Sequence, residues 1–282
     1  MKPEFIKNIL FCLCAMFFFA SSDVFAKQMS VHYPALQLAW FRYFCAMLCC
    51  APLLFRPVNF NQVHFGGQII RGIGMSGATV FLIAGIGVLP LAEATALCFV
   101  SPVFVISLSV LFLKENVRFA QWLQVLCGII GMCFILRPGF SAIQMAALFP
   151  LFSAMCWACA LVFSKRALMH DKIQLTALFS TITGFSLLTI VQPWVFVWPD
   201  KSHLFLLLLM GLAWCIAHIF IILAYTSSDV PVSKLAPFSY TQLIWATIGG
   251  YIFFNNIPNL TTIIGSAIII LSGIWAVMRR HA

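Results

Sequence analysis

Long and nearly continuous runs of apolar residues dominate the chain, and polar residues gather in short clusters between these runs. A helix needs about 20 mostly apolar residues to cross the roughly 30 Å hydrocarbon core of a bilayer. The strands of a membrane barrel are shorter, about ten residues, and alternate apolar with polar positions. The pattern therefore predicts an all-α integral membrane protein with ten transmembrane helices, at residues 6–25, 36–55, 66–88, 91–113, 119–136, 143–163, 173–195, 204–224, 232–254 and 262–278.

Composition agrees with this pattern and adds an orientation. Hydrophobic residues make up 63% of the chain and charged residues 8%, unlike an ordinary soluble domain. Cytoplasmic turns of membrane proteins carry an excess of Lys and Arg, which predicts an N-terminus in the cytoplasm, with Lys27, Arg137 and Lys201 on the outer side. The inner side then holds Lys2, Lys7, Arg56, Arg71, Lys114, Arg118, Lys165, Arg166, Lys172, Arg279 and Arg280. We expect a multi-pass protein of the cytoplasmic (inner) membrane with both termini in the cytoplasm.

The two halves of the chain resemble each other when the sequence is shifted by 141 residues. The aligned pairs, without a gap, are residues 90–93 with 231–234, Phe99 with Tyr240, Ser101 with Gln242, Phe104 with Trp245 and Phe112 with Phe253. Each half would hold five helices, and because five is odd the second half would enter the membrane from the opposite side. This predicts two inverted repeats, at residues 1–139 and 140–282, an arrangement typical of secondary transporters. Similar helix composition alone is the alternative explanation.

Glu93 is the most informative polar residue in the predicted spans. It follows Pro90 by three positions, and Pro favours the first position of a helix. A helix N-terminus stabilises a carboxylate by roughly 0.3–1 kcal/mol, whereas an acid at the membrane centre costs about 2.5–3.5 kcal/mol. A cap near the interface and a cavity-facing substrate contact are therefore both open. The repeat makes Lys234 its counterpart at the opposite mouth, without direct contact, and Ser101 and Gln242 lie deeper on the same helix faces.

Further polar residues inside the spans are candidate substrate contacts, because buried ionisable groups are costly unless they are paired or functional. Asp23 is expected to pair with Lys27 one turn on, or alternatively with Arg42. His218 is either a hydrogen-bonded core residue or a proton carrier. Pro102 interrupts the hydrogen bonding of its helix, which produces a kink or leaves carbonyls facing a cavity. The aromatic candidates for a cationic or planar ligand are Trp40, Tyr240 and Trp245.

Several segments together resemble one known family. They are LPLAEATAL at residues 89–97, SPVF at 101–104, LKE at 113–115, APFSYTQLIWA at 236–246, and Asp23 with Lys27 and WFRY at 40–43. This pattern, which covers essentially the whole chain, is similar to EamA-type proteins of the drug/metabolite transporter superfamily, especially a subgroup described as S-adenosylmethionine uptake carriers. The resemblance implies two inverted five-helix repeats, a central cavity and transport of small metabolites. The chain departs from the family at Asn256, where relatives usually carry a glutamate, which puts a symmetric pair with Glu115 in doubt.

From these features we expect a secondary transporter that moves a small zwitterionic or cationic metabolite, similar to S-adenosylmethionine or an amino acid, by alternating access. An exporter of amino acids, other metabolites or drugs is the alternative, and a membrane-embedded enzyme or a non-transporting membrane subunit is a more distant one. The chain lacks the sequence motifs of such an enzyme, and its eleven cysteines fall inside predicted helices, where Cys is a small packing residue. We therefore expect no enzyme activity, cofactor or metal.

The expected partners are a small-molecule substrate and the lipid bilayer. The formal net charge of +9 follows from basic turns that face anionic lipid, so it does not require a nucleic acid. A homodimer stays an open alternative.

Overall fold

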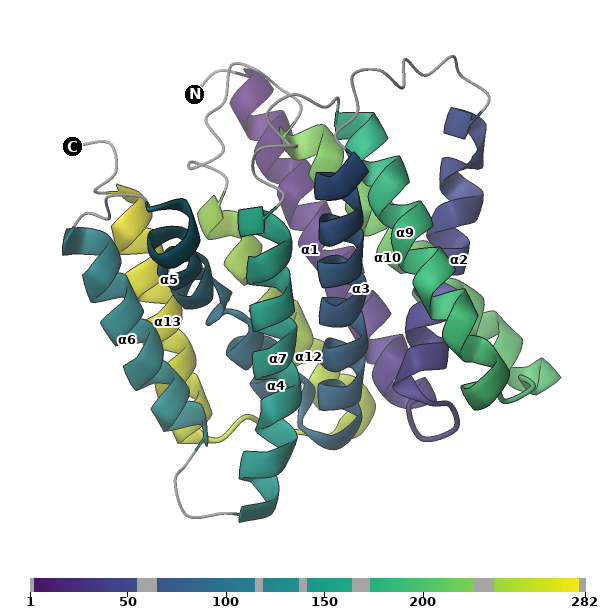
Figure 1. Cartoon of the computed structure of the whole chain (residues 1–282). Coiled ribbons are helices and arrows are strands. Elements are labelled where there is room, and N and C mark those ends of the chain that lie inside the picture. Colours follow the sequence, from purple (N-terminus) through teal and green to yellow (C-terminus); the bar gives the residue numbers. More distant parts are fainter. Residues whose placement is uncertain are drawn as a thin grey trace.

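The computed structural model describes residues 3–54, 65–114, 119–136, 141–163, 173–225 and 236–278, and the regular structure in these ranges is helical (Figure 1). The helices are α1 (Pro3–Met29), α2 (Ala35–Leu54), α3 (Phe65–Val88), α4 (Leu91–Cys98), α5 (Ser101–Leu113), α6 (Phe119–Leu136), α7 (Ser141–Phe163), α9 (Ile173–Val195), α10 (Lys201–Tyr225), the 3₁₀ helix η2 (Ala236–Tyr240), α12 (Thr241–Phe254) and α13 (Leu260–Met278). Each predicted span meets one of these helices or a consecutive pair of them.

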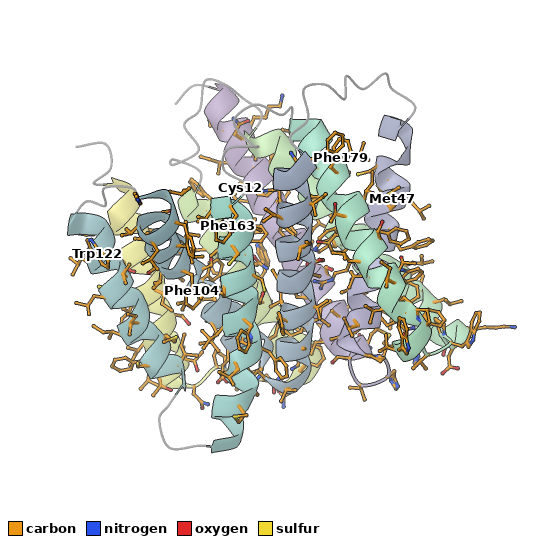
Figure 2. The ribbon with its side chains drawn as sticks, viewed as in Figure 1. Cys12, Met47, Phe104, Trp122, Phe163 and Phe179 are labelled. Carbon is orange, nitrogen blue, oxygen red and sulfur yellow. The ribbon has the colours of Figure 1, made fainter. Side chains whose placement is uncertain are left out.

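The helices have the length and composition of membrane spans. Within the described residues six are long and apolar enough to cross a bilayer, and shorter apolar stretches follow in α2, α6 and α13. Large apolar side chains project outward around the bundle, among them Trp122 at 48% and Phe163 at 40% exposure (Figure 2). Polar side chains such as Gln37 and Arg42 are instead buried. Exposed apolar side chains around a bundle that also buries charged groups are typical of a membrane protein, and they confirm the predicted all-α membrane fold.

Two spans are interrupted near their middles. The first breaks between α4 and α5, where the N–H groups of Phe99 and Val100 donate to carbonyls three residues back, at 3.1 Å each. Pro102 follows directly and has no N–H of its own, so an α-helical ladder cannot run through this point. The second span changes from the 3₁₀ helix η2 to α12 after Tyr240. The rings of Phe99 and Tyr240 contact each other, with centroids 5.1 Å apart, so the two breaks meet inside the bundle.

The packing of the helices places the two breaks in the central part of the bundle. There α1 packs along α10, and α3 along α7. At one end α6 packs on α13, where Gly131 and Gly265 face each other; a Cβ at Gly131 would lie 2.7 Å from the carbonyl oxygen of Gly265. At the other end α2 packs on α9 and α10. Figure 1 shows α1 beginning and α13 ending on the same side of the bundle, as expected for an even number of spans.

Candidate functional site

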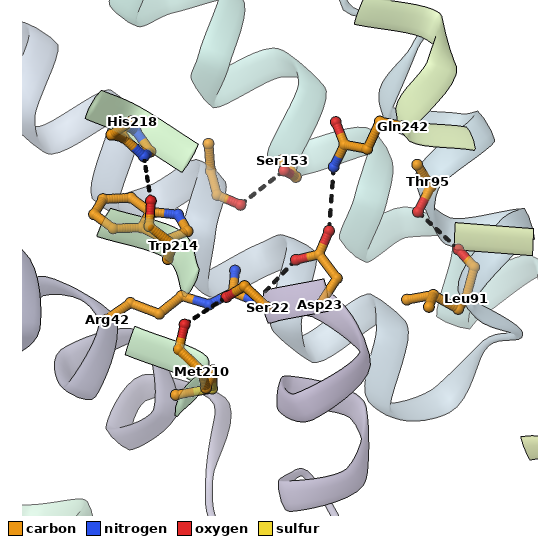
Figure 3. Close-up of polar contacts among 11 residues, drawn as sticks. Ser22, Asp23, Arg42, Leu91, Thr95, Ser153, Met210, Trp214, His218 and Gln242 are labelled. Atoms are coloured by element: carbon orange, nitrogen blue, oxygen red, sulfur yellow. Dashed lines mark hydrogen bonds and ion pairs between the residues drawn. The ribbon is translucent and has the colours of Figure 1, made fainter. Parts of the chain in front are cut away.

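An ion pair buried between α1 and α2 forms the centre of the candidate site. Arg42 Nη2 donates to Asp23 Oδ1 at 2.8 Å, and the two side chains are only 1% and 4% exposed. Gln242 Nε2 of α12 donates to the other carboxylate oxygen, Oδ2, at 3.2 Å (Figure 3). One carboxylate therefore joins residues from both halves of the chain. The expected pairing of Asp23 with Lys27 is wrong, and the alternative partner, Arg42, is the one that the structure contains.

Lys27 turns away from Asp23 and binds the end of α3. Its Nζ donates to the carbonyls of Ile86 at 2.7 Å and Leu89 at 2.6 Å. The last carbonyls of a helix have no partner within that helix, and the negative end of the helix dipole favours a cation there. This burial against another helix outcompetes a bond to a residue one turn back on α1.

Glu93 lies in the first turn of α4, as predicted, and is 7% exposed. Thr262 of α13 donates its hydroxyl to Glu93 Oε1 at 3.1 Å, and the carboxylate interacts electrostatically with Lys27. Glu93 thus combines the predicted helix-start position with contacts to two other helices. Its proposed counterpart Lys234 lies outside the described residues, as does Glu115, so the predicted lack of contact between Glu93 and Lys234 stays a prediction.

A second group of side chains lies on the α10 side of the ion pair. The His218 Nδ1–H donates to the carbonyl of Trp214 at 3.0 Å, and the two rings pack with centroids 3.9 Å apart. Trp214 also packs on the buried ring of Tyr43, 5.1 Å away. Ser22, next to Asp23, donates to the carbonyl of Met210 at 2.8 Å (Figure 3). His218 therefore has the geometry of a hydrogen-bonded core residue beside the ion pair.

Four further predicted site residues also do not bond to the ion pair. Trp40 donates to Thr189 Oγ1 at 2.9 Å, beside α9. Trp245 is 37% exposed on the outside of α12. Tyr240 and Ser101 are half-buried at the two helix breaks.

Gln37 and Arg71 were not among the predicted contacts. Gln37 is fully buried and bonds both backbone groups of Val197, donating to its carbonyl at 2.7 Å and accepting from its N–H at 2.8 Å. Arg71, counted above among the cations of the inner side, is the seventh residue of α3 and lies within the predicted span 66–88. Its Nε is buried and donates to no acceptor. A polar residue inside an apolar run was the sequence signal for both.

The polar groups of the site suit a charged organic ligand. Within the described ranges no group of three His, Cys, Asp or Glu side chains could hold a metal ion. The polar groups brought together are a carboxylate, a guanidinium and an amide, with aromatic rings on one side. Such a set can bind a ligand that carries charge and an aromatic or apolar body.

The chain matches a known protein family and resembles several known transporters in sequence. Residues 6–137, and again 144–278, match the model of the EamA-like transporter family. The chain is 24% identical to an S-adenosylmethionine uptake transporter of Rickettsia prowazekii over 94% of this chain and 90% of that protein. It is 28% identical to a riboflavin transporter of Vibrio cholerae over 96% of this chain and 93% of that protein. A solved structure that is 19% identical shares the fold, with a TM-score of 0.64 over 97% of this chain and 98% of the other.

Proposed function

Because the chain belongs to the EamA-like transporter family, we propose that it is a secondary transporter that carries a small zwitterionic or cationic metabolite across the cytoplasmic membrane by alternating access. The observation that carries the proposal is the buried Asp23–Arg42 pair with its bond from Gln242. Charged side chains inside a membrane protein are costly and characteristically mark substrate or ion pathways. The same three residues also connect the two halves of the chain, which would move relative to each other during transport.

An inverted repeat supports this mechanism, and several features of the structure agree with one. Lys114 and Asn255, which are 141 positions apart, both end helices in the left-handed conformation, with φ of 52° and 53°. The helix breaks occur at Phe99 and Tyr240, also 141 positions apart, and these residues touch. Exchanging the halves converts the α1–α10 contact into the α7–α3 contact, which is also present. Two halves related in this way would form equivalent gates on opposite sides of the membrane. One gate would then close while the other opens.

The ion pair offers a way to bind a zwitterion without leaving a bare charge inside the membrane. A substrate ammonium or sulfonium would replace Arg42 on Asp23, while the substrate carboxylate would bind the released guanidinium. Each buried charge then keeps a partner, which avoids the cost of several kcal/mol for an isolated buried ion. Asp23 and Arg42 are 3% and 1% exposed, so this conformation is closed around the pair. Transport would require it to open toward each side in turn.

S-adenosylmethionine fits these requirements better than riboflavin, because it carries an ammonium, a sulfonium and a carboxylate, whereas riboflavin carries no charge at neutral pH. An S-adenosylmethionine-like or amino-acid-like substrate is therefore the first candidate. Membership of the family and the similarity to an S-adenosylmethionine transporter support this choice.

Counterflow in proteoliposomes tests the proposal directly. Purified protein would be reconstituted into liposomes that are loaded with unlabelled S-adenosylmethionine. The entry of labelled S-adenosylmethionine would then be measured, with threonine, methionine and riboflavin as separate competitors. We expect saturable exchange that falls roughly tenfold or more in Gln242→Leu, because a hydrogen bond to a charged group contributes about 1.5–3 kcal/mol. Tyr251→Phe, on an exposed position of the same helix, serves as the control. If a folded sample exchanges none of these compounds, the proposed function is overturned.

A further inference from the structure

Arg71 is a partly buried cation of α3, and one nitrogen of its guanidinium lacks a hydrogen bond. It lies in the second turn of α3, about 9 Å from the start of that helix at a rise of 1.5 Å per residue. Its Nε is buried and makes no hydrogen bond. More than nine in ten buried polar groups in proteins have a hydrogen-bond partner, so an orphaned guanidinium nitrogen within a span points to a missing ligand.

No acid in the part of the chain with described side chains neutralises Arg71. Asp23 bonds Arg42 and Gln242, and Glu93 bonds Thr262. Asp200 is 79% exposed and lies beside His203, at the end of the bundle where α10 begins. Among the described side chains, none of these acids forms an ion pair with Arg71.

The surroundings of Arg71 link it to the ion pair. Arg71 interacts electrostatically with Tyr43 and with His218, and Arg42 acts on the same two residues. Tyr43 follows Arg42 in α2, and Trp214 packs against both Tyr43 and His218. Thr79 of α3 donates its hydroxyl to the Met75 carbonyl at 2.9 Å and lies close to the hydroxyl of Tyr43. Tyr43 and His218 are thus near both Arg71 and Arg42.

We propose that Arg71 binds the carboxylate of the transported metabolite together with the released Arg42. A guanidinium presents paired N–H donors that match the two oxygens of a carboxylate, and these charge-assisted bonds are stronger than neutral ones. The substrate carboxylate would give Arg71 an anionic partner that none of the described acids supplies. The inference rests on the proposed transport function and narrows it, because the substrate must carry an anionic group and a purely cationic metabolite is rejected.

Two pairs of compounds that differ at the carboxylate test the inference. They are S-adenosylmethionine with its decarboxylated form, and methionine with methioninamide. In wild-type protein we expect the carboxylate member of at least one pair to compete roughly 10- to 100-fold better in counterflow of labelled S-adenosylmethionine. Arg71→Gln should reduce this preference to threefold or less, and Arg71→Lys should restore part of it. Lys7→Gln, which removes an exposed positive charge from α1, should leave the preference unchanged.

The outcomes separate the carboxylate site from the transport function. Exchange with no preference in either pair, or a preference that persists in Arg71→Gln, overturns the role of Arg71 while transport stands. If wild-type protein exchanges none of these compounds, the transport proposal fails. Thermal unfolding in detergent then tests whether Arg71 binds a carboxylate. Greater stabilisation by a carboxylate member, lost in Arg71→Gln, then supports the site. Equal unfolding temperatures with both members of both pairs overturn it.

Discussion

Removing the negative charge of Asp23 should destabilise the protein more than almost any other single isosteric change. Asp23→Asn keeps the shape but leaves Arg42 charged at 1% exposure. At the observed 2.8 Å separation and an effective dielectric constant of about 20, the direct attraction is roughly 6 kcal/mol, most of it offset by desolvation. Breaking a buried pair from one side costs about 3–5 kcal/mol, because the remaining ion keeps its desolvation cost. For a protein of this size that predicts a fall in unfolding temperature of roughly 6–20 °C.

A double substitution separates this structural role from transport. Asp23→Leu with Arg42→Met replaces both charges by apolar groups of similar size, which is often neutral or stabilising. We expect the double variant to unfold within about 4 °C of wild type, yet to show no counterflow of S-adenosylmethionine. Thermal unfolding in detergent and counterflow would be measured on the same preparations, with Asp200→Asn, at an exposed acid, as the control. A double variant as unstable as the sum of its single changes, or a fully stable Asp23→Asn, would refute the reasoning.

Two further substitutions test other parts of the structure. Glu93→Gln keeps the oxygen that accepts the hydrogen bond from Thr262 but removes the negative charge. We expect a free energy of unfolding within about 1 kcal/mol of wild type and at least a tenfold loss of counterflow. Full transport activity would show that Glu93 has no part in the mechanism. Gly184→Ala should destabilise the protein by about 1–3 kcal/mol in thermal unfolding, because the new Cβ would overlap the ring of Tyr43. Gly66→Ala, with nothing within 4 Å of the added Cβ, is its control, and equal stability of the two variants would contradict the packing.

The helices could be predicted from the sequence because the thickness of a bilayer sets the length of an apolar run. The predicted span 119–136 agrees with α6 to the residue, and the break within 91–113 follows from Pro102. The left-handed ends at Lys114 and Asn255 gave no comparable signal, since neither is a glycine.

The partners of the site residues were harder to predict than the helices. Spacing alone favoured Lys27 for Asp23, because residues four apart share a helix face. Tertiary packing decided otherwise, since the end of α3 offers Lys27 two carbonyls. The sequence identified Trp245 as an aromatic candidate but did not show which side of its helix faces the site. In the structure Trp245 is partly exposed on the outside of α12.

The position of the ion pair in the chain has a consequence for how the protein is made. Asp23 and Arg42 are 19 positions apart on the first two helices, whereas Asp23 and Gln242 are 219 positions apart. Each charge alone would raise the cost of membrane insertion by about 2.5–3.5 kcal/mol. The first helical hairpin can neutralise both charges as soon as it enters the bilayer, long before the ribosome completes the chain. The bond from Gln242 forms only after the ninth span is synthesised, so the two halves become joined at this carboxylate near the end of biogenesis.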